Sequence, residues 1–198
     1  MRLIAQIKGA NGSGKTTIMK QLIDLAGDCY YLLRDDYNLY DLKGKPYATV
    51  LYNLKWIIMG HYPKTAKGGG CDNIHKVDHM KAILDDLHAS YSPNYSIVFE
   101  GAMISSTMTL YYHIRDMHDV TARAVLLRAS LEGCIRRLEH RKGIKLTLDS
   151  FNHVEDKCLR IFRQDHLYIA NHIRSIDVDN IAEEEMVYEF LDVVGWKP

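Results

Sequence analysis

The sequence lacks the features that would place it among secreted or membrane proteins. Its four cysteines (Cys29, Cys71, Cys134, Cys158) are widely spaced and form no C-x-x-C pair, so we expect free, reduced thiols. No apolar run approaches the roughly 18 residues that a membrane span requires. The N-terminus reads directly as a strand, without the basic and apolar regions of a secretory signal. These absences favour a cytoplasmic protein with no membrane association.

A net charge of one sign is also absent, because 25 basic residues balance 25 acidic ones. The balance is uneven along the chain, however. Residues 177–198 hold seven acidic side chains against Lys197 alone, which leaves a surplus of six positive charges in residues 1–176. This surplus permits a basic surface facing nucleic acid, although scattered, solvated lysines and arginines explain it equally well.

The length of 198 residues, 47% of them hydrophobic, indicates one globular domain spanning residues 1–198. Apolar runs alternate with amphipathic stretches, which predicts an α/β fold of three layers with a mostly parallel five-stranded sheet flanked by helices. The expected strands are Leu3–Ile7, Cys29–Leu33, Ser96–Phe99, Ala122–Leu127 and Ser175–Val178. The expected helices are Lys15–Leu25, Thr49–Met59, Lys76–Ala89, Thr107–Asp116, Leu131–His140, Leu148–His172 and Ala182–Val193. Residues 60–75 predict a long Gly-rich loop, and 131–147 a lid region that ends in a basic link.

The motif with the most specific chemistry is Gly9-Ala-Asn-Gly-Ser-Gly-Lys15-Thr16, a full G-x-x-x-x-G-K-[ST] match between an apolar strand and a helix. In such a P-loop, backbone N–H groups and the helix N-terminus bind nucleotide phosphates. Lys15 is expected to reach the β- and γ-phosphates and to act in catalysis, while the Thr16 hydroxyl binds Mg²⁺. The expected ATP-binding residues are Gly9, Asn11, Gly12, Ser13, Gly14, Lys15, Thr16 and Thr17.

The class of P-loop protein follows from what accompanies this motif. A GTPase normally carries Asn-Lys-x-Asp, which does not occur here, and motor-type ATPases need a longer chain. A kinase needs an acceptor-side carboxylate and a basic lid. Asp35 and Asp36 follow the second expected strand, at the edge of a parallel sheet where ligands bind, although two adjacent acids also suit a turn or a helix cap.

Two further patterns fit a kinase. Arg137 and Arg141 share one helix face, from which lid arginines can clamp phosphates, although a solvent-facing basic helix has the same pattern. Glu100 ends an apolar strand and is expected to hold Mg²⁺ through water, with a capping role as the alternative.

The spacing from the P-loop to Arg34-Asp35-Asp36-Tyr37 resembles the 5′-kinase domain of phage polynucleotide kinase, over residues 1–37. This resemblance implies that Asp35 is the general base, and it supports Arg137 and Arg141 as the lid pair. That family carries an Arg after the Tyr, where this chain has Asn38, so we expect the acceptor to be held differently. Arg34, Asp36 and Asn38 are candidate substrate contacts.

The segment Lys67-Gly-Gly-Gly-Cys-Asp72 suits a close approach of backbone to a ligand, although a floppy connector has the same composition. Lys67, Gly69, Gly70 and Asp72 are candidate substrate contacts, and the neighbouring Tyr62 and Lys64 would suit a nucleic-acid strand. Cys71, His75 and His79 lack the spacing of a zinc knuckle, so no metal site is predicted there.

With its P-loop and this Gly-rich insertion, the chain is also similar to the phage P-loop kinases of thymidine hypermodification. That resemblance implies transfer of the γ-phosphate of ATP, with Mg²⁺, to the hydroxymethyl group of 5-hydroxymethyluracil in DNA, within the host cytoplasm. The alternatives are a nucleoside or nucleotide kinase, a polynucleotide 5′-hydroxyl kinase, and a nucleotide-binding regulator without transferase activity. The donor adenine is expected near Arg174–Asn180.

Overall fold

The structure is a computed structural model that describes residues 2–32, 45–63, 69–74, 76–101 and 108–196. All structural statements below refer to these residues. The strands are β1 (Arg2–Gly9), β2 (Cys29–Leu32), β3 (Ala48–Leu51), β4 (Trp56–Met59), β5 (Ser96–Glu100), β6 (Val120–Arg128) and β7 (Arg174–Asp177). The helices are α1 (Lys15–Ala26), α2 (Val77–Ser90), α3 (Thr109–Arg115), α4 (Leu131–Lys142), α5 (Leu148–Arg163), α6 (Asp165–Ala170) and α7 (Met186–Val194), with short 3-10 turns η2 (Cys71–Asn73) and η3 (Glu183–Glu185).

One mixed sheet runs through the molecule in the order β2-β3-β4-β5-β1-β6-β7. The pairs from β4 to β7 are all parallel, whereas β3 is antiparallel to both β2 and β4. The α/β class and the mostly parallel sheet are therefore confirmed, with seven described strands in place of the expected five.

The two additional strands correct the expected helix Thr49–Met59, which is a β3–β4 hairpin. Both strands are fully buried, and β-branched and aromatic residues dominate their Thr-Val-Leu and Trp-Ile-Ile cores. A short apolar run of this kind does not distinguish a buried strand from a buried helix, and pairing with β5 decided it here.

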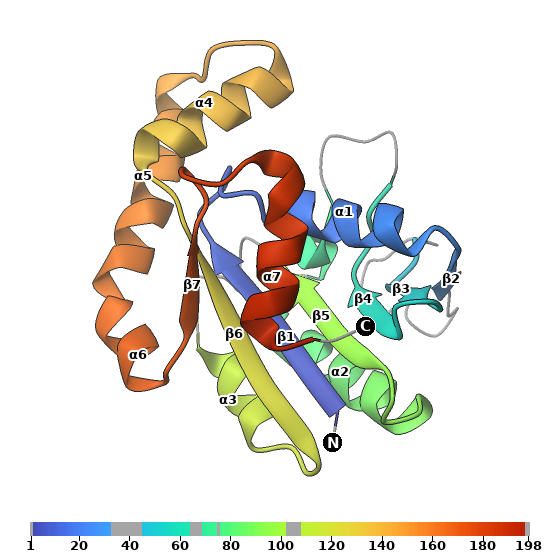
Figure 1. Ribbon diagram of the computed structural model, residues 1–198. Coiled ribbons are helices and arrows are strands. Elements are labelled where there is room, and N and C mark those ends of the chain that lie inside the picture. Colours follow the sequence, from blue (N-terminus) through green and yellow to red (C-terminus); the bar gives the residue numbers. More distant parts are fainter. Residues whose placement is uncertain (1, 33–44, 64–68, 75, 102–107, 197–198) are drawn as a thin grey trace.

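Helices cover both faces of the sheet (Figure 1). The side chains of α1 and α7 pack on one face, against Ala5 and Ile7 of β1. The side chains of α2 and α3 pack on the other, against Ile4. Alternate residues of β1 thus enter two separate cores, and its carboxyl end emerges between the layers.

The expected long helix Leu148–His172 is two helices, α5 and α6, which meet at Gln164. The Gln164 N–H bonds to the carbonyl of Ile161, and its side-chain carbonyl accepts a hydrogen bond from Tyr168 Oη at 2.9 Å. Helices α4 and α5 form a hairpin whose apolar side chains pack on the P-loop residue Ala10. This hairpin stands above the carboxyl ends of β1 and β6 in Figure 1, and α4 with its connection to α5 covers residues 131–147, where the sequence predicts a lid.

All four cysteines are free thiols. Among the helices that the structure describes, none has both the length and the apolar character needed to cross a bilayer.

Candidate active site

The P-loop turns sharply between β1 and α1, and its glycines are required by close packing. Gly12 and Gly14 have φ values of 85° and 96°, in the region that favours glycine. A Cβ on Gly12 would lie 2.5 Å from the carbonyl oxygen of Cys134 in α4. Helix α4 therefore lies directly on the P-loop.

Lys15 is buried at the start of α1, and its Nζ donates hydrogen bonds to the carbonyl oxygens of Gly9 and Ala10, each at 2.9 Å. Burial lowers the pKa of Lys15, and the carboxylates of Glu100 and Asp72 partly offset this effect. The ammonium is thus held over the loop with little competition from water, where it can meet a phosphate.

Glu100 ends β5 beside β1, opposite Ile7 in the register. Its Oε1 accepts hydrogen bonds from Thr16 Oγ1 at 3.0 Å and from Tyr62 Oη at 3.4 Å. Burial raises the pKa of Glu100 to about 7, and Asp72 adds to the rise while Lys15 opposes it. A hydroxyl and a carboxylate this close together are the hard oxygen ligands that suit Mg²⁺.

The Gly-rich loop closes at its base against this carboxylate. The backbones of His61 and Gly70 exchange hydrogen bonds of 2.9 and 3.3 Å. Gly70, with φ 101°, lies so close that a Cβ would be 2.6 Å from Glu100 Oε1. The end of the loop therefore packs directly on the Glu100 carboxylate.

Side chains in this loop divide between the core and the cleft. Tyr62 is 1% exposed and bonds to Glu100, so its interpretation as a nucleic-acid stacking residue is wrong. The Sγ of Cys71 is buried and donates to the carbonyl oxygen of Met59. Gly69 and Asp72 line the cleft beside Lys15. Lys64, Lys67 and His75 lie outside the described residues.

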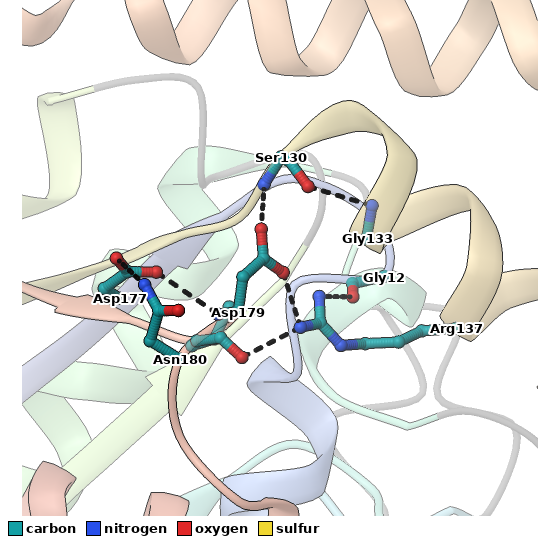
Figure 2. Close-up of polar contacts among 8 residues, drawn as sticks. Gly12, Ser130, Gly133, Arg137, Asp177, Asp179 and Asn180 are labelled. Atoms are coloured by element: carbon teal, nitrogen blue, oxygen red, sulfur yellow. Dashed lines mark hydrogen bonds and ion pairs between the residues drawn. The ribbon is translucent and has the colours of Figure 1, made fainter.

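Arg137 of α4 lies on the P-loop and on the segment after β7 (Figure 2). Its guanidinium donates to Asp179 Oδ1 at 2.7 Å, to the carbonyl oxygen of Val178 at 2.8 Å and to that of Gly12 at 3.4 Å. The other oxygen of Asp179 accepts from the N–H of Ser130 at 2.6 Å. Desolvation alone would raise the pKa of Asp179, but the bonds from Ser130 and Arg137 leave it below its usual value.

A cleft of about 980 Å³ brings the P-loop, Glu100, the Gly-rich loop and the lid together. Of the predicted site residues, Asn11, Gly12, Gly14, Thr16, Thr17, Arg137 and Arg141 line this cleft, whereas Ser13 is buried beneath the loop. Sequence reasoning missed two contacts: the hydrogen bond that Tyr62 donates to Glu100, and the ion pair between Arg137 and Asp179. It also missed the cleft-lining residues His140, Asp149, Ser150 and His153. These contacts join segments that are distant in the sequence, and no local sequence motif marks them.

Of the acceptor-side candidates, Arg34, Asp35, Asp36 and Asn38 lie outside the described residues. The strand that precedes them, β2, points in the same direction as β1 because two antiparallel steps separate it from β4. Strand β2 lies at the edge of the sheet. Four interstrand spacings separate it from β1, a distance of about 19 Å.

A family model described as 5-hmdU DNA kinase matches residues 3–188 of this chain. Three phage proteins with that name are similar in sequence. The protein of Bacillus phage SP10 is 25% identical over 98% of this chain and 29% of its own length. Those of Pseudomonas phage PaMx11 and Salmonella phage ViI are each 26% identical, over 72% and 69% of this chain and 70% and 58% of their own. The chain therefore spans less than a third of the first of these relatives.

Solved structures share the fold at low sequence identity. A tunicamycin resistance protein from Deinococcus radiodurans aligns with a TM-score of 0.56 and 14% identity, over 100% of this chain and 98% of that one. A gluconokinase from Sinorhizobium meliloti 1021 aligns with a TM-score of 0.50 and 15% identity, over 98% and 93%. These likenesses support the P-loop kinase fold.

Proposed function

Because the chain belongs to the 5-hmdU DNA kinase family, we propose that it transfers the γ-phosphate of ATP to the hydroxymethyl group of 5-hydroxymethyluracil in DNA. The observation that carries the proposal is the grouping of Lys15, Thr16 and Glu100 in one cleft under a basic lid. Phosphoryl transfer needs little covalent help from the protein, so positioning and charge stabilisation are the main requirements. These residues supply both.

On the donor side, the P-loop N–H groups bind the phosphates, and the Lys15 ammonium is set to meet the β- and γ-phosphates. Arg137 and Arg141, both on the cleft wall, offset the charge that develops on the transferred group. The contacts of Arg137 with Val178 and Asp179 support a donor base site beside Arg174–Asn180.

The Thr16 and Glu100 side chains fit a Mg²⁺ ion, because both offer oxygen atoms at the phosphate end of the cleft. Thr16 would ligate it directly and Glu100 through water. Mg²⁺, when bound, offsets charge on the β- and γ-phosphate oxygens. The raised pKa of Glu100 leaves its carboxyl sensitive to such a nearby cation.

On the acceptor side, Asp35 is proposed as the general base that takes the proton of the hydroxymethyl group. This role rests on the sequence resemblance. Gly69 and Asp72 form the cleft wall near Lys15, and Gly70 lies against Glu100 behind them, so a base that has left the DNA stack can be held there. Arg34, Asp36, Asn38 and Lys67 are the remaining proposed substrate contacts.

The proposal is tested with γ-labelled ATP and a panel of acceptors. These are duplex DNA containing 5-hydroxymethyluracil, plain duplex with 5′-hydroxyl ends, and free nucleosides and nucleotides. Label that enters the modified duplex and survives 5′-end phosphatase is the expected result. Label confined to 5′ ends or to free nucleosides would contradict the proposed substrate and leave the kinase assignment standing. Absence of transfer to every acceptor would contradict the kinase assignment itself.

Two variants assign the roles. Asp35→Asn should abolish transfer and retain ATP binding, since only the proton acceptor changes. Lys15→Met should impair both, because it removes the cation that meets the phosphates. A nucleotide-binding regulator would tolerate Asp35→Asn without any functional loss.

A further inference from the structure

The connection between α4 and α5 presents an aliphatic side chain to solvent. Ile144 is 65% exposed and stands between Lys142 and Lys145. Leu148, the first residue of α5, is 75% exposed and extends this apolar tip. Apolar residues so exposed at the tip of a basic hairpin contribute nothing to the core.

The loop that carries Ile144 is held in shape by hydrogen bonds at both ends. Gly143, with φ 71°, ends α4 with its N–H bonded to the carbonyl oxygen of Glu139 at 2.8 Å. The Glu139 carboxylate accepts bonds from the N–H of Leu146 and from Lys145 Nζ, each at 3.0 Å. Thr147 Oγ1 then accepts from the N–H of Ser150 at the start of α5. The position of Ile144 is therefore built into the fold.

This tip lies at the mouth of the active-site cleft. Arg141, Lys142 and Leu146 line the cleft, so residues on both sides of Ile144 in the sequence belong to the cleft wall. Residues 136–145 carry five Lys or Arg side chains and one Glu, which makes this the basic margin of the cleft. In Figure 1 the α4–α5 connection forms the top of the molecule, far from α6 at the lower left.

We propose that Ile144 is a wedge that enters the base stack of duplex DNA and occupies the space vacated by the target base. The inference rests on the proposed function and on the target base leaving the stack, which carries its hydroxymethyl group from the major groove into the cleft. Proteins that unstack bases insert apolar side chains between base steps, and the flanking cations bind the adjacent phosphates. Lys142, which lines the cleft beside the wedge, is placed for such a phosphate contact.

The test compares Ile144→Ala with wild type on two DNAs that carry the same 5-hydroxymethyluracil, one a fully paired duplex and the other a single strand. The variant should lose about tenfold or more in kcat/KM on the duplex and stay near wild type on the single strand, because only the duplex requires unstacking. Ile144→Met should restore duplex activity. The matched control is Ile169→Ala on α6, which removes an isoleucine of 67% exposure far from the cleft and should change neither activity.

A second readout is independent of catalysis. In duplex DNA with 2-aminopurine beside the target base, wild type should raise the fluorescence on binding, and Ile144→Ala should not. Equal losses on duplex and single strand, or no loss on either, would overturn the wedge. If wild type phosphorylates 5-hydroxymethyluracil in neither DNA, the proposed function fails. The wedge is then judged by fluorescence alone, and a wild-type protein that causes no rise overturns it.

Discussion

At the scale of single residues, Gly70 shows how closely the backbone of the Gly-rich loop packs against the Glu100 carboxylate. An alanine there needs both a left-handed backbone and space that Glu100 Oε1 occupies at 2.6 Å. We expect Gly70→Ala to lower the free energy of unfolding by about 2–4 kcal/mol and to reduce phosphate transfer at least about tenfold.

Gly27→Ala is the matched control, because Gly27 also has a positive φ, of 70°, but a Cβ there would meet nothing within 4 Å. Gly27→Ala should lower the free energy of unfolding by about 1 kcal/mol through backbone strain alone, and the rate of phosphate transfer should not change. Urea unfolding and initial-rate assays measure the two effects. Equal losses in both variants would mean that contact with Glu100 is unimportant.

Lys8 is a second residue whose environment has a measurable consequence. It is fully buried in β1, with Nζ 5.7 Å from the centre of the Tyr168 ring. Burial lowers the pKa of Lys8 to about 7, from 10.5 in the unfolded chain. Between these two values the unfolded state binds more protons, so this group makes stability rise with pH and penalises folding most below pH 7.

We therefore expect Lys8→Met to stabilise the fold at pH 6, and the gain to shrink by about 3 kcal/mol by pH 9. Urea unfolding of both proteins at each pH measures this difference. Lys81→Met, on the outer surface of α2, should change stability by less than about 0.5 kcal/mol at either pH. A gain that is constant across the range would show that packing, and not charge, controls this position.

At the scale of elements, Asp179 joins the lid helix to the sheet. One oxygen accepts from the N–H of Ser130, which begins α4, and the other from Arg137 two turns later (Figure 2). Gly133 is required between them, because a Cβ there would lie 2.4 Å from Asp179 Oδ1. The lid is thereby fixed over the P-loop by a segment that follows β7.

We expect Arg137→Ala and Asp179→Ala each to weaken ATP binding about tenfold. The double variant should bind ATP at most about threefold more weakly than either single variant. Nucleotide titration of the four proteins in a double-mutant cycle measures the coupling. Arg141→Ala provides the contrast, with an expected loss in kcat at nearly unchanged ATP affinity. Fully additive effects of Arg137→Ala and Asp179→Ala would show that the pair does not act as a unit.

At the scale of the whole molecule, a net charge of zero conceals an uneven distribution. The acidic residues concentrate in 177–198, whereas the lid margin over 136–145 is basic. DNA binding through this margin should depend on salt, since each phosphate contact releases a counterion.

We expect Lys142→Ala to reduce the slope of log affinity against log salt by about 1 for duplex DNA. Arg123→Ala is the control, because Arg123 is an exposed cation near the opposite end of β6 from the cleft. Its slope should equal that of wild type. Fluorescence anisotropy over a salt series gives both slopes, and identical values in all three proteins would place the DNA elsewhere.

The sequence by itself determined the parts whose information is local. The P-loop is one contiguous motif between a strand and a helix, and Glu100 ends an apolar run, so β1, α1 and the phosphate end of the cleft could be predicted without coordinates. The resemblance to this kinase family was accessible for the same reason, because it was seen in two contiguous segments, the P-loop and Lys67–Asp72.

Tertiary structure decided what depends on pairing between distant segments. The run 49–59 suits a buried helix or a buried strand, and only its neighbours in the sheet made it the β3–β4 hairpin. Tyr62 reads as an exposed aromatic of a polar loop, yet its ring is buried in the core and its hydroxyl reaches Glu100, 38 positions away. Arg137 and Asp179 meet across 42 positions. Non-local contacts of this kind leave no periodic or motif signal, because the chain specifies them only through the summed packing of the whole fold.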